Sequence, residues 1–266
     1  MHLLDLSVIL GYLGLIVLVG FRVSRGVKTA KDFFLAGRSL PWWIIGLSII
    51  GTNIDSNNYV GASGNAYATG LAQANFEWIG AIPAMIIASL IFIPIFWKAG
   101  VYSIPEYLGR RYSQSVRLLV ALIFTLSGIF VLSIAMYALA ITLETYLGWP
   151  IVVGVLVSGL VVAAYSISGG LSAVTFTDAL QVSIMFGCAI IVAYLGFMEM
   201  GGINVFLNRL EAKSPTHLNP YLPANHPDFP WTGVILGLGI VLSPAYWIGS
   251  QAILQRTLAA KSQWDA

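Results

Sequence analysis

The sequence predicts an all-α integral membrane protein with seven transmembrane helices, and three observations support this fold class. First, 58% of the 266 residues are hydrophobic and 9% are charged, with a mean hydropathy of +0.85. A soluble domain of this length cannot bury so much apolar surface. Second, apolar runs long enough to cross a lipid bilayer recur along the chain. Third, the Lys and Arg residues gather in a few short segments between these runs, as the positive-inside rule requires.

The expected spans follow one another with short connections. They cover residues 3–21, 41–70, 75–97, 116–147, 151–167, 173–200 and 231–258. The first is a peripheral or anchoring helix, and together with the basic loop behind it we expect it to form a segment over residues 1–40. The loop at residues 201–230 is the largest polar connection and is rich in Pro and Asn.

The distribution of basic residues predicts one orientation in a plasma or inner membrane. One side of the membrane holds Arg22, Arg25, Lys28, Lys31, Arg38, Lys98, Arg110, Arg111, Arg117, Arg256 and Lys261, and the other holds Arg209 and Lys213. We expect the first side to be cytoplasmic, which places the N-terminus outside. Within one of these loops, Ser103, Pro105 and Glu106 have the pattern of a helix start, so we expect a short surface helix there.

The stretch from Gly46 to Gly70 predicts a broken membrane helix. After an apolar run that ends at Ile50 come Gly51, Thr52, Asn53, Asp55, Ser56, Asn57 and Asn58. Only one crossing of about 20 residues fits between Pro41 and Gly70, and irregular backbone at membrane depth is tolerated where it lines a cavity or is buried in protein. We therefore expect a binding site at the break. The alternative interpretations are a packing face of small residues at 61–64 and a loop outside the membrane.

A second interruption lies in the seventh span, where Ser243, Pro244, Gly249 and Ser250 break the apolar run. Broken second and seventh spans, separated by four continuous ones, are expected if residues 41–200 form a five-helix repeat. Residues 231–266 would then open an inverted second copy, and residues 201–230 would form an extracytoplasmic loop. The alternative is an ordinary proline kink packed with aromatic residues.

Five segments resemble the sodium/solute symporter family, with the greatest likeness to its sodium/glucose cotransporter branch. They are FFLAGRSLPWW (33–43), NFEW (75–78), KAGVYSIPEYLGRRY (98–112), YSISGGLSAVTFTDALQ (165–181) and QAILQRTLAAK (251–261). The resemblance implies the first half of a 5+5 inverted-repeat, LeuT-type fold. It also implies sodium-coupled symport of a small polar solute, a monosaccharide above all, by alternating access.

The resemblance further implies roles for individual residues. Backbone carbonyls at Gly51 and Ile54 match positions that help hold sodium, and Asp178 matches a carboxylate near the sodium path. Side chains that match sugar-binding positions are Asn53, Asn58, Glu77 and Ser243. Tyr246 matches the aromatic residue that stacks on the sugar and gates it from the inside, with Trp247 beside it.

Four of these residues have a structural alternative. Glu77 would face water at the level of the lipid headgroups. Asp178 would cap the start of its helix next to Thr177. Tyr246 and Trp247 would be packing aromatics.

Departures from the family pattern leave the solute open. Asn58 stands where close relatives of the animal glucose carriers have histidine, Asp55 where they have a small residue, and Ser250 where they have an acid. An amino acid, a polyol or a carboxylate is therefore the main rival to a sugar. The extra carboxylate of Asp55 would suit a cation or a cationic solute.

Family members carry a complete second repeat, and the sequence ends at Ala266. We therefore expect the N-terminal part of a symporter, either a fragment or one piece of a split protein, with the missing C-terminal half as its partner. A symporter-like sensory or regulatory membrane domain is the alternative from another class, and a signalling domain after Ala266 would favour it. We expect neither an enzyme nor a nucleic-acid binder, since the acids and histidines lack the spacing of a catalytic or metal site.

Overall fold

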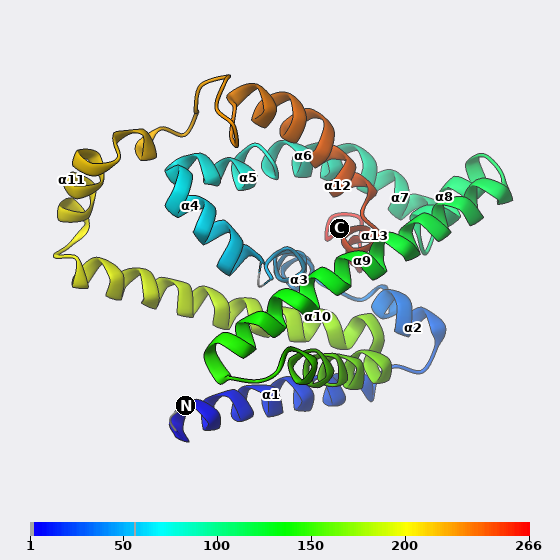
Figure 1. Cartoon of the computed structure of the whole chain (residues 1–266). Coiled ribbons are helices and arrows are strands. Elements are labelled where there is room, and N and C mark those ends of the chain that lie inside the picture. The colour runs from blue at the N-terminus through cyan, green and yellow to red at the C-terminus, as the bar shows by residue number, and fades with distance from the viewer. Residues whose placement is uncertain (1–2, 56) are drawn as a thin grey trace. The chain divides into compact units, whose positions relative to one another are not determined.

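The computed structural model describes residues 3–55 and 57–266, and its regular elements there are helices, with isolated β-bridges at Leu40–Ala260 and Leu222–Pro230 (Figure 1). The chain divides into two compact units. The first comprises the described residues within 1–57, 94–181 and 251–266, and the second comprises 58–93 and 182–250. Each unit therefore gathers segments that lie far apart in the sequence.

In the first unit, three distant segments share an apolar cluster. Its elements are α1 (Leu3–Ser24), α2 (Ala30–Leu35), η1 (Ala36–Arg38), α3 (Trp42–Asn53), most of α7 (Ile93–Ala99), α8 (Ile104–Arg111), α9 (Gln114–Leu147), the first part of α10 (Ile151–Glu199) and α13 (Gln251–Leu258). Ile44 of α3, Leu171 of α10 and Ala259 behind α13 are buried in the same cluster. The backbone joins two of these segments, because the Leu40 N–H donates to the Ala259 carbonyl at 3.1 Å.

The second unit contains helices of several geometries. Its elements are most of η2 (Asn57–Ala62), α4 (Ser63–Thr69), η3 (Gly70–Ala74), α5 (Asn75–Trp78), α6 (Ile82–Ile87), η4 (Ala88–Phe92), the rest of α10, α11 (Ile203–Lys213), η5 (Pro215–Leu218), η6 (Gly233–Leu242) and α12 (Ser243–Gly249). The π-helices η4 and η6 end two residues before Pro94 and Pro244. A proline ring clashes with the carbonyl of the preceding turn, and the wider π turn relieves that clash.

The predicted surface helix is confirmed as α8. Ser103 is its N-cap, and the Ser103 hydroxyl accepts the Glu106 N–H at 3.3 Å. Glu106 Oε2 accepts the Tyr102 N–H at 2.8 Å, so two backbone donors at the helix start are satisfied by side chains. The cap thus fixes where α8 begins after the turn that follows α7.

The predicted break in the second span is also confirmed. Helix α3 ends at Asn53, and Ile54 is extended (φ −107°, ψ 111°). Helical geometry resumes in η2 at Asn57. Ser56, which belongs to the predicted polar stretch, lies outside the described residues.

The second predicted interruption lies at Ser250. Backbone geometry stays helical through Leu242 and Ser243, with Pro244 in the first turn of α12. Ser250 is extended (φ −77°, ψ 121°), and α13 begins at the next residue. The proline is therefore accommodated within the helix, and the chain leaves the helix six residues later.

Seven separate spans are not confirmed. Within the described residues, four helical stretches are long and apolar enough to cross a membrane: 6–24, 58–99, 114–147 and 151–199. A fifth is counted if η6–α12 and α13 together form one broken span. Part of the difference lies in α10, because this one stretch of 49 residues contains two expected spans, 151–167 and 173–200, on either side of the non-helical Gly170. Helix α3, with 12 residues, is too short to count alone.

Candidate functional site

The broken end of α3 offers polar backbone groups within an apolar sequence. Gly51 lies in the last turn of α3 and Ile54 just beyond it, and both are half-buried. The last carbonyls of a helix have no partner further along the helix and carry its partial negative charge. Asn53 Nδ2 donates to the Ile49 carbonyl at 2.7 Å, so this amide is bonded to its own helix. The chemistry of the helix end suits a small cation.

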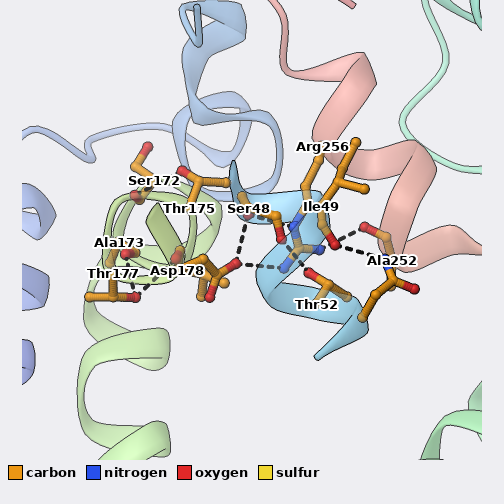
Figure 2. Close-up of polar contacts among 12 residues, drawn as sticks. Ser48, Ile49, Thr52, Ser172, Ala173, Thr175, Thr177, Asp178, Ala252 and Arg256 are labelled. Atoms are coloured by element: carbon orange, nitrogen blue, oxygen red, sulfur yellow. Dashed lines mark hydrogen bonds and ion pairs between the residues drawn. The ribbon is translucent and has the colours of Figure 1, made fainter. Parts of the chain in front are cut away.

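One turn before this end, Ser48 connects α3 to a buried ion pair (Figure 2). The Ser48 hydroxyl donates to Asp178 Oδ2 of α10 at 2.6 Å. Arg256 of α13 donates from Nη2 to the same carboxylate oxygen at 3.0 Å and from Nε to Ser48 Oγ at 2.7 Å. Its Nη1 donates to the Ala252 carbonyl of its own helix at 2.7 Å. Three helices thus meet through one carboxylate, one hydroxyl and one guanidinium.

The ion pair is shielded from solvent. The Asp178 and Arg256 side chains are 13% and 10% exposed, and Ser48 is fully buried. Taking two opposite charges out of water costs free energy that their attraction repays only with good geometry and further hydrogen bonds. Here Ser48 and the Ala252 carbonyl supply those further bonds. Because such an arrangement is costly in a membrane, the pair is a candidate functional element.

Asp178 does not cap a helix start. It lies inside α10, eight residues after the break at Gly170, where the backbone is helical. Its neighbour Thr177 is fully buried and bonds backward to the Ala173 and Val174 carbonyls, both at 2.9 Å. The capping interpretation is therefore wrong, and the carboxylate is directed at Ser48 and Arg256 (Figure 2).

Neither Ser48 nor Arg256 is identified as a site residue by the sequence. The charge pattern counts Arg256 among the basic residues of the cytoplasmic side, and the structure adds that its side chain is buried against Asp178. The signal available in the sequence is Asp178 itself, since an intramembrane acid needs a counter-charge. No motif pairs positions 178 and 256, so only the fold can supply the partner.

The remaining predicted site residues lie in the second unit. The Ser243 side chain is buried, and its hydroxyl has no hydrogen-bond partner among the described residues. Trp247 Nε1 donates to the Gly80 carbonyl at 3.1 Å, and its ring packs edge-on against Tyr246 with centroids 5.5 Å apart. Tyr246 is 43% exposed. Among the predicted site residues of this unit, Ser243 is therefore the one whose buried hydroxyl is available to a polar ligand.

Asn58 and Glu77 are placed differently from one another. Asn58 is half-buried at the start of the π-helical segment η2. Glu77 in α5 is exposed, and so is its neighbour Trp78 at 67%. A role of Glu77 in binding a solute thus rests on the family resemblance of its segment, NFEW. The described residues contain no cluster of His, Cys, Asp and Glu that could hold a metal ion by side chains alone.

Comparison with known proteins gives a consistent result along the whole chain. The chain is 36% identical to a sodium/glucose cotransporter of Vibrio parahaemolyticus over 99% of its length and 50% of that protein. It is 35% identical to sodium/glucose cotransporter 1 of Mus musculus, covering 97% of this chain and 42% of that one. It is 34% identical to sodium/glucose cotransporter 4 of Homo sapiens, covering 98% of this chain and 41% of that one. The chain thus spans half or less of the length of these relatives.

A solved structure has the same fold. The substrate-bound, outward-open form of a Na⁺-coupled sialic acid symporter superimposes with a TM-score of 0.87 at 24% identity, over 99% of this chain and 55% of that one. This likeness concerns the fold and confirms an all-helical membrane architecture of the symporter type. Residues 33–266 match the family described as sodium:solute symporters. The chain belongs to the sodium:solute symporter family.

Proposed function

We propose that the protein containing this chain couples the inward flow of sodium to the uptake of a monosaccharide by alternating access. The activity is proposed for the whole protein, because the chain covers about half of its relatives. The driving force would be the sodium gradient plus about 2.3 kcal/mol per charge for each 100 mV of membrane potential.

The observation that carries the proposal is the break of α3 between Asn53 and Asn57. An interrupted helix in an apolar chain offers carbonyls and side chains to a polar ligand, and this is how transporters build sites for ions and solutes. In this proposal the carbonyls of Gly51 and Ile54 are sodium ligands, and Asp178 lies on the sodium path.

The assignment of a sugar has separate support. Relatives named sodium/glucose cotransporters are 33–36% identical to the chain. A sugar needs many hydrogen-bonding partners and an aromatic face. We assign the first role to Asn53, Asn58, Glu77 and Ser243. We assign the aromatic face to Tyr246, with Trp247 beside it.

Uptake into proteoliposomes tests the proposal directly. The full-length protein that contains this chain is reconstituted, and uptake of labelled D-glucose is compared with inward gradients of sodium and of potassium. We expect uptake only with sodium, and its loss when an ionophore collapses the gradient. Parallel arms use an amino acid, a polyol and a carboxylate. Sodium-dependent uptake of one of these, without glucose uptake, would replace the sugar; no sodium-dependent uptake in any arm would refute symport.

A further inference from the structure

Arg256 already holds the position that a cation bound to Asp178 would take. Its Nη2 lies 3.0 Å from Asp178 Oδ2, within the first layer of groups around that carboxylate. Ser48 donates to the same oxygen, so the two partners converge on one atom (Figure 2). A sodium ion and a guanidinium cannot both occupy this position.

We propose that Arg256 is a tethered cation that competes with sodium for Asp178, so that sodium reaches this carboxylate only after Arg256 withdraws. The inference rests on the proposed function, which puts Asp178 on the sodium path. Arg256 itself is a positioning residue in this scheme and contacts no solute.

The contacts of Arg256 are suited to such an exchange. Its Nη1 bonds to the Ala252 carbonyl, one turn back on the same helix. That bond can persist while the Ser48 and Asp178 bonds break, because it involves no other element. The side chain can therefore swing within α13 without unfolding the helix. Ser48 holds both charged groups and sits one turn before the broken end of α3, which links the exchange to the proposed sodium carbonyls.

Competition has a measurable consequence for sodium affinity. When the binding-competent state is only partly populated, the apparent dissociation constant is the intrinsic one divided by the populated fraction. Replacing the guanidinium with a neutral group makes the carboxylate permanently available. The variant should therefore bind sodium more tightly, whereas a purely structural ion pair would give equal or weaker binding on removal of one partner.

Sodium binding is measured on the purified full-length protein by titration and by the sodium-induced rise in thermal unfolding temperature, neither of which needs a solute. For Arg256→Gln we expect half-saturation at a sodium concentration lower by about fivefold or more, a typical coupling between two binding events. Arg256→Lys keeps a positive charge but loses the planar guanidinium that donates to both Ser48 and Asp178. Its half-saturating sodium concentration should therefore also fall, but by less than in Arg256→Gln. The double variant D178N/R256Q should show no gain over D178N.

Arg110→Gln is the matched control, because the Arg110 side chain is 56% exposed and pairs with Glu106 on the surface of α8. It should leave sodium binding unchanged. Unchanged or weaker sodium binding in Arg256→Gln would overturn the inference, and if that variant does not fold, an unchanged Arg256→Lys would do so. Absence of sodium binding in the wild type would refute the proposed sodium coupling together with the inference, whereas sodium binding without sugar uptake would refute the sugar alone.

Discussion

Gly170 lies against the backbone of Phe33, so closely that a Cβ atom on Gly170 would fall 2.4 Å from the Phe33 carbonyl oxygen. The backbone of Gly170 has φ 52° and ψ −146°, a conformation that residues with a side chain rarely adopt. This residue interrupts the helical geometry of α10 and lies eight residues before Asp178. The contact therefore helps to set the direction in which the second part of α10 carries its carboxylate.

Replacing Gly170 with alanine should destabilise the protein. The new Cβ would meet both an unfavourable φ and the Phe33 carbonyl, and strained backbone alone costs about 1–3 kcal/mol. Thermal unfolding of the purified full-length protein should show a lower transition temperature for Gly170→Ala, with weaker sodium binding if Asp178 is displaced.

Gly159→Ala is the control for that experiment. Gly159 lies in the same helix, and a Cβ atom added to it would meet no heavy atom within 4 Å. Alanine is the better helix former by about 1 kcal/mol, so this variant should be as stable as the wild type or more so. Equal stability of the two variants would mean that the close approach of Gly170 to Phe33 does not constrain the fold.

The start of α2 should depend on pH through Asp32. The Thr29 hydroxyl and then the backbone N–H groups of Lys28 and Thr29 hold the pKa of the Asp32 carboxyl below its ordinary range. The carboxylate accepts the Thr29 N–H at 3.0 Å, while Thr29 Oγ1 accepts the Asp32 N–H at 3.1 Å, which completes a capping box.

Because the pKa of Asp32 is lower in the folded state, its stabilising effect is present above the unfolded pKa of about 3.9. It is lost as the pH falls through the lower, folded value. Hydrogen exchange of the α2 amides, corrected for the intrinsic effect of pH, should therefore accelerate in that acidic window. Asp32→Asn should remove this acceleration, and an acid response that persists in that variant would contradict the assignment to Asp32.

Asp178→Asn should be costly for stability as well as for sodium binding. The change leaves the buried guanidinium of Arg256 without its counter-charge, and breaking a buried pair costs about 3–5 kcal/mol. Unfolding of the full-length protein in denaturant should show the loss. The double variant D178N/R256Q should recover part of it, because no unpaired charge is left. A double variant no more stable than Asp178→Asn would mean that the pair contributes little.

The local features of the fold were predictable because neighbouring residues determine them. The break of α3 follows from a cluster of amide and acidic residues beyond Ile50 in an apolar run, and α8 follows from Ser103 and Glu106 at capping distance. Membership in a transporter family also agrees with the expectation that the chain is not an enzyme. Such signals need no knowledge of how distant segments pack.

The number of spans and the partner of Asp178 depend on longer-range structure. Hydropathy gives the lengths of apolar runs, but the angle at which one run follows another, as at the non-helical Gly170, depends on backbone geometry. Arg256 lies near the end of the seventh expected span in the sequence, where a basic residue is usually taken as a loop charge. Its pairing with Asp178, 78 positions earlier, arises only when α3, α10 and α13 pack together.

Tyr246 and Trp247 should respond differently to substitution although they are adjacent. Trp247→Phe keeps an aromatic ring but removes the donor to the buried Gly80 carbonyl, which should cost about 1 kcal/mol of stability and leave the solute KM nearly unchanged. Tyr246 is more exposed, so Tyr246→Ala should cost less stability. Under the proposed function it removes the aromatic face for the sugar and should raise the KM for uptake. Thermal unfolding and uptake kinetics on both variants separate the two roles. A raised KM in Trp247→Phe with unchanged stability would instead mean that the indole N–H serves the solute directly and that its bond to Gly80 has no structural role.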